Sequence, residues 1–67
     1  MEFTIKKARQ YAGLTQQEIA KKLGISTKTY QNYENGKTAM RIDKAKKFSS
    51  ITNIPLSKIV FLLSNYG

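Results

Sequence analysis

Apolar residues recur along the chain at helical spacing, and turn residues divide them into short segments. Gly13, Gly24, Gly36 and the Asn-Ile-Pro run at residues 53–55 mark the breaks. The segments between them hold roughly ten to sixteen residues, too few for a β-α-β unit. Lys, Gln, Ala and Ile dominate these segments. The pattern therefore predicts an all-α fold of five helices without a sheet.

The first helix is predicted over residues 4–12, because Ile5, Ala8 and Ala12 share one of its faces. Gly13 then ends it. The second helix has a clear start at Gln16, since Thr15 and Glu18 have the spacing of a capping box. Its buried stripe and its end are expected at Ile19, Ala20, Leu23 and Gly24.

The third helix is predicted over residues 27–35, with Ser26 as its cap and Tyr30 and Tyr33 buried. Its outer face is polar but mostly uncharged and holds Thr27, Lys28, Gln31 and Asn32. Two short helices joined by a tight glycine turn, the second with such a face, are typical of a DNA-reading helix-turn-helix. Amide side chains can bind adenine, and Lys can donate to guanine. An ordinary solvated helix face would show the same polarity.

The fourth helix is predicted over residues 42–52, with Ala45, Phe48 and either Ile51 or Thr52 facing inward. A fifth helix is predicted after it. Pro55 suits a first helical position, where its missing N–H is not needed. The apolar residues expected to cover the core from this helix are Leu56, Ile59, Val60 and Leu63.

The composition excludes most catalytic and metal-binding chemistry. The 67 residues contain neither Cys nor His, which removes zinc sites, disulfides, Cys nucleophiles and His general bases. We therefore expect no enzyme, no metal, no cofactor and no small-molecule ligand. The longest apolar run, residues 59–63, is too short for a membrane helix, and the charged start of the chain does not resemble a signal peptide. A cytoplasmic location is the expectation.

The charge indicates a polyanionic partner. Twelve Lys and Arg stand against four Asp and Glu, a formal net charge of +8. Nucleic acid is the favoured partner of so basic a chain. Solubility alone could also account for the charge. A membrane surface fits less well, because the charges are dispersed and do not form one face of an amphipathic helix.

Two sequence runs resemble the phage repressor and Cro-type (Xre-like) helix-turn-helix family. The first is GLTQQEIAKKLGIS at residues 13–26, and the second is YQNYENGK at residues 30–37. The resemblance covers residues 5–61. It implies a single DNA-binding domain over residues 1–67, in which five helices form a compact lambda-repressor-like fold and helices 2 and 3 form the helix-turn-helix. It also implies a cytoplasmic regulator in a bacterial or phage-infected cell.

The resemblance also implies roles for individual residues. Thr27, Lys28, Gln31 and Asn32 occupy positions from which family members touch base edges. The positions that imply phosphate contacts are Gln16, Asn35 and Lys37, and Thr29 is expected to bind either phosphate or base. Arg41, in the basic connector after the third helix, is a further candidate for a phosphate contact. Arg9 and Glu34 match an ion pair of the family that clamps the first helix to the end of the third. Arg41 departs from the family pattern, where many members have proline or a small residue, so the boundaries of the fourth helix are less defined.

The resemblance favours a small Cro-like repressor that binds palindromic double-stranded DNA as a weak dimer. Apolar residues in excess of one core-facing stripe, Phe61, Leu62 and Tyr66, are candidates for the dimer contact. The same tail could instead fold back on its own core. The alternatives from other classes are a protein-interaction module of antirepressor or antitoxin type, which would use the apolar C-terminal helix, and an RNA-binding protein, which would stack bases on Tyr30 and Tyr33.

Overall fold

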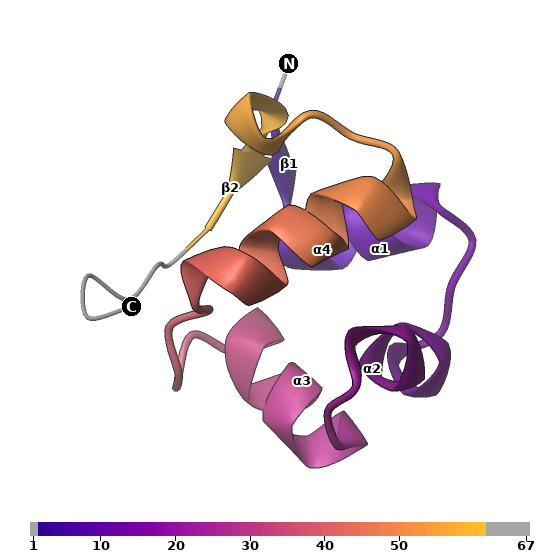
Figure 1. Ribbon diagram of the computed structural model, residues 1–67, viewed down its shortest axis with the longest axis vertical. Coiled ribbons are helices and arrows are strands. Elements are labelled where there is room, and N and C mark those ends of the chain that lie inside the picture. Colours follow the sequence, from indigo (N-terminus) through magenta and orange to yellow (C-terminus); the bar gives the residue numbers. More distant parts are fainter. Residues whose placement is uncertain (1, 62–67) are drawn as a thin grey trace.

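The computed structural model describes residues 2–61, which form short helices and a small sheet around one core (Figure 1). The elements in chain order are β1 (Phe3–Thr4), α1 (Ile5–Tyr11), α2 (Gln16–Leu23), α3 (Thr27–Glu34), α4 (Ile42–Thr52), the 3₁₀ helix η1 (Leu56–Lys58) and β2 (Ile59–Val60). The first four predicted helices are present within a residue of their expected bounds.

A hydroxyl side chain caps each of the first three helices. Thr4, Thr15 and Ser26 each accept a hydrogen bond from the backbone N–H three residues later. At α2 the cap is reciprocal, because the Glu18 carboxylate also accepts from the Thr15 amide at 2.8 Å. Such bonds satisfy N–H groups that have no partner within a helix. The helix starts are therefore encoded locally.

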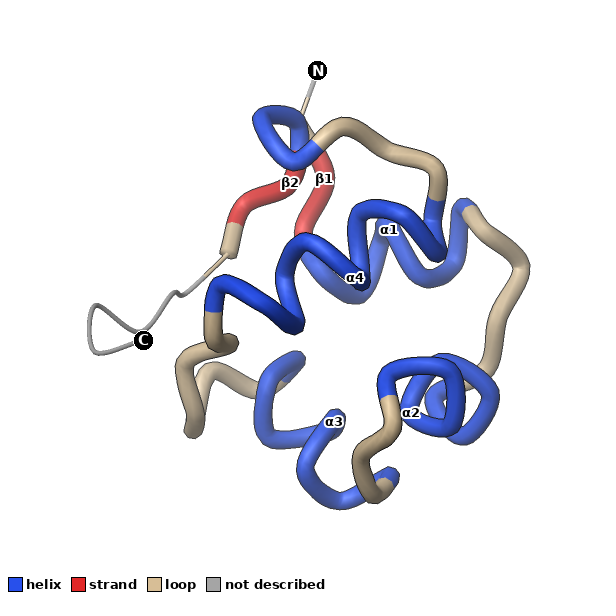
Figure 2. Tube along the Cα trace, viewed as in Figure 1, coloured by secondary structure: helices blue, strands red, loops and turns tan. Residues whose placement is uncertain are grey.

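The predicted fifth helix is wrong. Residues 56–58 form a single 3₁₀ turn, and the chain then becomes extended as β2 (Figure 2). β2 pairs in parallel with β1, with Phe3 opposite Ile59 and Thr4 opposite Val60. The β-branched pair Ile59 and Val60 favours an extended backbone, and pairing with β1 supplies its hydrogen bonds. The expectation that the fold contains no sheet is therefore also wrong.

This change alters which C-terminal residues reach the core. Ile59 is buried, whereas Leu56 and Val60 are 37% and 53% exposed. The strand has a period of two, so neighbouring side chains point to opposite faces and only one of the Ile-Val pair can face inward. Leu63, the fourth residue expected to cover the core, lies outside the described residues.

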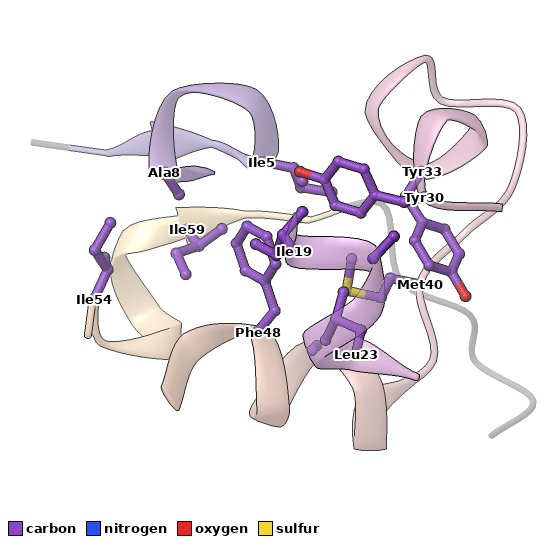
Figure 3. Close-up of a cluster of buried hydrophobic side chains, with 12 residues drawn as sticks. Ile5, Ala8, Ile19, Leu23, Tyr30, Tyr33, Met40, Phe48, Ile54 and Ile59 are labelled. Carbon is purple, nitrogen blue, oxygen red and sulfur yellow. The ribbon is translucent and has the colours of Figure 1, made fainter. Parts of the chain in front are cut away.

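Aromatic and aliphatic side chains from all four α-helices form the core (Figure 3). The ring of Phe48 stacks on that of Tyr30 with centroids 6.5 Å apart, and Phe61 meets Phe48 edge-on at 5.8 Å. Met40 is fully buried although it lies in the connector before α4, and Ile54 is buried after it. Neither residue belongs to a helical stripe, which is why periodicity did not predict them.

The N-terminal part of α4 is tied to the end of α2. The Lys44 ammonium donates a hydrogen bond to the carbonyl of Leu23 at 3.0 Å, at the C-terminus of α2 where a positive charge is favourable. In Figure 1, α3 lies at one end of the molecule, and η1 with the two strands lies at the other. The helix expected to read DNA is thus held far from the sheet.

Candidate nucleic-acid interface

A three-residue connection sets the angle between α2 and α3. Gly24 adopts the left-handed conformation, with φ of 74°, and ends α2. The Ile25 amide then donates back to the Ala20 carbonyl at 3.0 Å, and Ser26 caps α3. Ala20 itself is 1% exposed. A larger side chain at this position would push the two helices apart.

The two faces of α3 separate as the spacing predicts. Tyr30 and Tyr33 are buried in the core. The four expected base-reading residues lie on the remaining surface: Lys28 is exposed, whereas Thr27, Gln31 and Asn32 are partly buried. Because both tyrosines belong to the core, their rings are not available as stacking platforms for RNA bases. This outcome removes the observation that favoured an RNA-binding protein.

A shallow groove joins the start of α2 to α3. Its volume is about 520 Å³, and its lining includes Gln16, Gln17, Thr27 and Gln31. The backbone N–H groups of Gln16 and Gln17 belong to the first turn of α2 and have no acceptor within the helix. The positive end of the helix dipole and these donors favour an anion. The groove therefore brings a candidate phosphate-binding site, the first turn of α2, next to two candidate base-contacting residues, Thr27 and Gln31.

An ion pair adjoins this groove, because Arg9 is also among the residues that line it. The Arg9 Nε atom is 2.6 Å from Glu34 Oε2, and the two side chains are only 12% and 5% exposed. Arg9 also donates to the Leu14 carbonyl at 2.9 Å. The pair therefore connects α1, the loop before α2 and the end of α3.

Glu34 accepts two further hydrogen bonds from side chains. The Tyr30 hydroxyl donates to Oε2 at 2.5 Å, and Gln16 Nε2 donates to Oε1 at 3.0 Å. Gln16 Oε1 in turn accepts from Gln31 Nε2 at 3.2 Å. We call the five side chains of Arg9, Tyr30, Glu34, Gln16 and Gln31 the Glu34 network. Sequence reasoning identified the ion pair and missed the other three bonds.

The network keeps Glu34 ionised. Burial is the strongest influence on the pKa of Glu34 and acts to raise it, but the hydrogen bonds from Arg9, Tyr30 and Gln16 together outweigh burial and lower the pKa below its usual value. The hydrogen bond to Glu34 raises the pKa of Arg9. Burial raises the pKa of the Tyr30 hydroxyl, so this group remains a donor.

The expected phosphate-binding residues beyond Gln16 occupy two other places. Thr29 lies in the first turn of α3, where its hydroxyl accepts from the Ser26 hydroxyl at 2.9 Å. Asn35, Lys37 and Arg41 are exposed along the chain after α3 and do not line the groove. The Arg41 guanidinium lies 3.8 Å from the Asp43 carboxylate.

Of the three residues suggested for a dimer contact, only Phe61 falls within the described part of the chain. It is partly buried and packs against the core. Leu62 and Tyr66 lie outside the described residues. Val60, the neighbour of Phe61, is 53% exposed, more than any other large aliphatic side chain in the described part of the chain.

Comparison with known proteins identifies the family. A helix-turn-helix family model (HTH_3) matches residues 5–59, most of the chain. Neither a curated protein nor a solved structure matches the chain significantly. Within residues 2–61 no helix is long and apolar enough to cross a membrane. The match covers α1 to α4 and the Glu34 network, so the chain belongs to the Xre-like and Cro-type helix-turn-helix family of DNA-binding transcription regulators.

Proposed function

We propose that this chain is a Cro-like repressor that acts as a single DNA-binding domain and occupies palindromic operator DNA as a dimer. The observation that carries the proposal is the juxtaposition in the groove: the first turn of α2 lies beside Thr27 and Gln31 of α3. A helix start binds phosphate, and a polar helix face beside it reads bases. Both groups are held by one rigid connection.

In this proposal α3 lies in the major groove. Lys28 is exposed and donates to guanine O6 and N7, whereas Gln31 and Asn32 present carboxamides suited to adenine. Thr27 contacts a thymine methyl or a base edge. Gln16 and Thr29, at the first turns of α2 and α3, bind the phosphates that flank the groove. Beyond α3, the exposed residues Asn35, Lys37 and Arg41 bind the backbone farther along.

Dimerisation follows from the size of the interface. A single module of this kind buries about 600–1,000 Å² on DNA, and specific sites are usually read by two units related by a two-fold axis. We propose that the dimer is weak without DNA and that Phe61, Leu62 and Tyr66 contribute to its contact. A repressor of this kind acts by occupying the operator and excluding other proteins from it.

Selection of bound sites from random duplex DNA, followed by footprinting, tests the proposal. We expect a palindrome whose half-sites are centred about one helical turn apart. Asn32→Ala should cost about 1–3 kcal/mol on the selected site and little on random duplex, and Lys37→Ala should weaken binding to both alike. Lys58→Ala is the matched control, since Lys58 is exposed on η1 at the end of the molecule opposite α3 (Figure 1). Failure to enrich any sequence would contradict the proposal.

A second candidate function is binding to a partner protein through the C-terminal segment. An apolar hollow there is lined by Glu2, Ser57, Phe61 and the exposed Leu56 and Val60. This surface is a 3₁₀ turn and a strand, and no longer the amphipathic helix that the sequence predicted. The variant Val60→Lys separates the two functions. If the chain binds DNA, the contacts of each monomer with DNA should persist in this variant. If the chain is an interaction module, the variant should lose its stoichiometric complex with the partner protein.

A further inference from the structure

The Glu34 network connects the buried ion pair to the surface of α3 by an unbroken series of hydrogen bonds. Arg9 and Tyr30 both donate to Glu34 Oε2, which leaves Oε1 to accept from Gln16 Nε2 at 3.0 Å. Gln16 then accepts from Gln31 at 3.2 Å. The first two donors come from α1 and from the buried face of α3, and the last residue lies on the groove.

The direction of each bond in this series is fixed by chemistry. An ionised carboxylate can only accept, so Gln16 must turn its NH₂ group toward Glu34. In the structure the carbonyl oxygen of Gln16 is the atom that faces Gln31. An oxygen can only accept as well, so Gln31 must turn its own NH₂ group toward Gln16. The order of donor and acceptor in both amides is thus set by the charge on Glu34.

The arrangement leaves a defined pair of groups on Gln31 for a ligand. One N–H of its NH₂ group is used by Gln16, and the second N–H and the carbonyl oxygen remain. A glutamine that offers one acceptor and one donor side by side matches adenine in the major groove, whose N6 donates and whose N7 accepts. Reversal of the amide would turn the carbonyl oxygen of Gln31 toward Gln16 and remove it from this pair.

We propose that Glu34 is a positioning residue for base recognition, which acts through Gln16 to preset the Gln31 amide for adenine. This inference rests on the proposed function, since it assumes that α3 enters the major groove. It assigns to the ion pair a role beyond clamping α1 to α3. It also gives Gln16 a second role, because the same side chain that is expected at phosphate orients a base reader.

The first test interrupts the series between Glu34 and Gln31. Gln16→Met keeps the length of the side chain, removes both hydrogen-bonding groups and leaves the contact of Arg9 with Glu34 in place. Gln10→Met is the matched control, because Gln10 is an exposed glutamine of α1 that does not line the groove. Affinities are measured on the selected site and on its single-base variants. Gln31→Ala identifies the base that Gln31 reads, because it removes the preference at that base and leaves the preferences at the other bases.

We expect Gln16→Met to reduce discrimination for adenine at that base roughly tenfold, within the range of one bidentate contact, and to leave discrimination at the Asn32 base unchanged. In the double variant with Gln31→Ala the loss at this base should be no larger than for Gln31→Ala alone. A loss of affinity that is equal for all bases would show that Gln16 binds phosphate only, and it would overturn the inference.

The second test changes Glu34 itself. Glu34→Gln removes the charge and permits an NH₂ group to face Gln16, which should weaken the adenine preference as Gln16→Met does. Because Arg9 then loses its partner, the variant is also made with Arg9→Met, and thermal unfolding shows whether each protein is folded. Wild-type adenine discrimination in a folded Arg9→Met/Glu34→Gln protein would contradict the proposal.

A measurement on the free protein separates the inference from the proposed function. The side-chain amide of Gln31 gives two N–H signals in ¹⁵N-resolved NMR spectra, and the one bonded to Gln16 should shift in Gln16→Met but not in Gln10→Met. If the protein bound no specific DNA while this shift was present, the proposed function would fail and the network would stand. If DNA bound specifically while neither this signal nor the adenine preference changed, the positioning role would fail alone.

Discussion

Glu34 accepts hydrogen bonds from three side chains, and its own side chain is only 5% exposed. A buried carboxylate is costly unless such donors replace the water that it loses. Arg9 supplies the compensating charge, and Tyr30 and Gln16 supply two further hydrogen bonds. At the scale of single residues, the proposed positioning role makes stability and recognition depend on the same group.

Removal of Arg9 tests how much the pairing of the buried Glu34 carboxylate contributes to stability. Arg9→Met keeps the aliphatic stem but leaves the Glu34 charge without its cation, and we expect the free energy of unfolding to fall by about 3–5 kcal/mol. Urea denaturation provides the measurement. Lys7→Met, at an exposed position of the same helix, is the control and should change stability by less than about 0.5 kcal/mol. A loss below about 1 kcal/mol for Arg9→Met would mean that the pair behaves as a solvated one.

The lowered pKa of Glu34 predicts acid sensitivity. A carboxyl group whose pKa is lower in the folded than in the unfolded protein contributes stability that is fully present above the unfolded value. That contribution is lost as pH falls through the folded pKa. We expect urea midpoints to decline below about pH 4.5, the ordinary range for Glu. The Arg9→Met/Glu34→Gln protein should decline less, and an equal decline in both proteins would assign the effect to other carboxylates.

At the scale of the elements, local signals account for what the sequence could predict. A hydroxyl cap and the amide that it accepts from lie three residues apart, so the starts of α1, α2 and α3 can be found without knowledge of the fold. The sheet could not be found in this way. Phe3 and Ile59 are partners from opposite ends of the described chain, and neither strand alone has a recognisable pattern.

The same distinction between local signals and long-range packing applies to the candidate site. Spacing alone separates Tyr30 and Tyr33 from the outer face of α3, and the family resemblance pairs Arg9 with Glu34. The bond that Gln16 donates to Glu34 and the bond that it accepts from Gln31 depend on how α2 packs against α3, which no local pattern specifies. The bond from Tyr30 to Glu34 could have been predicted from the sequence, because residues four apart on a helix are neighbours.

Two helix ends with the same backbone conformation permit a matched experiment. Gly24 ends α2 with φ of 74°, and Asn53 ends α4 with φ of 60°. A Cβ atom at Gly24 would meet nothing within 4 Å, so Gly24→Ala should cost only the backbone term, about 1–2 kcal/mol.

Asn53→Ala should destabilise the protein by a similar or smaller amount, since Asn tolerates this conformation better than Ala. Ser50→Ala, exposed within α4, is the control for both and should be nearly neutral. Urea denaturation measures all three. An unchanged Gly24→Ala protein would show that the end of α2 adjusts to a conformation available to any residue.

At the scale of the whole molecule, charge governs association with DNA. The net charge of +8 resides on side chains that are mostly exposed. Each phosphate that the protein neutralises should contribute a slope of about −0.9 to log K against log salt concentration. Lys37→Gln should reduce the total slope by about 1 and Lys58→Gln should leave it unchanged, as measured by fluorescence titration at several salt concentrations. An affinity independent of salt would contradict DNA binding.

The dimensions of the molecule suit a two-fold operator. Its principal extents are 27 × 24 × 18 Å. In the proposed dimer, two copies can therefore occupy half-sites centred about 34–36 Å apart, one turn of B-DNA, without overlap.

The parallel pairing of β1 with β2 has a consequence for how the protein opens. This pairing closes almost the whole described chain into one loop, yet each strand contributes only two residues. Such a closure is entropically expensive and has few bonds to hold it, so we expect it to form late in folding and to fray first. Amide protons of the strands would then exchange with solvent while those of α2 and α3 stay protected. In the proposed complex, the end of the protein that faces away from DNA would open transiently, and the end that contacts DNA would stay ordered.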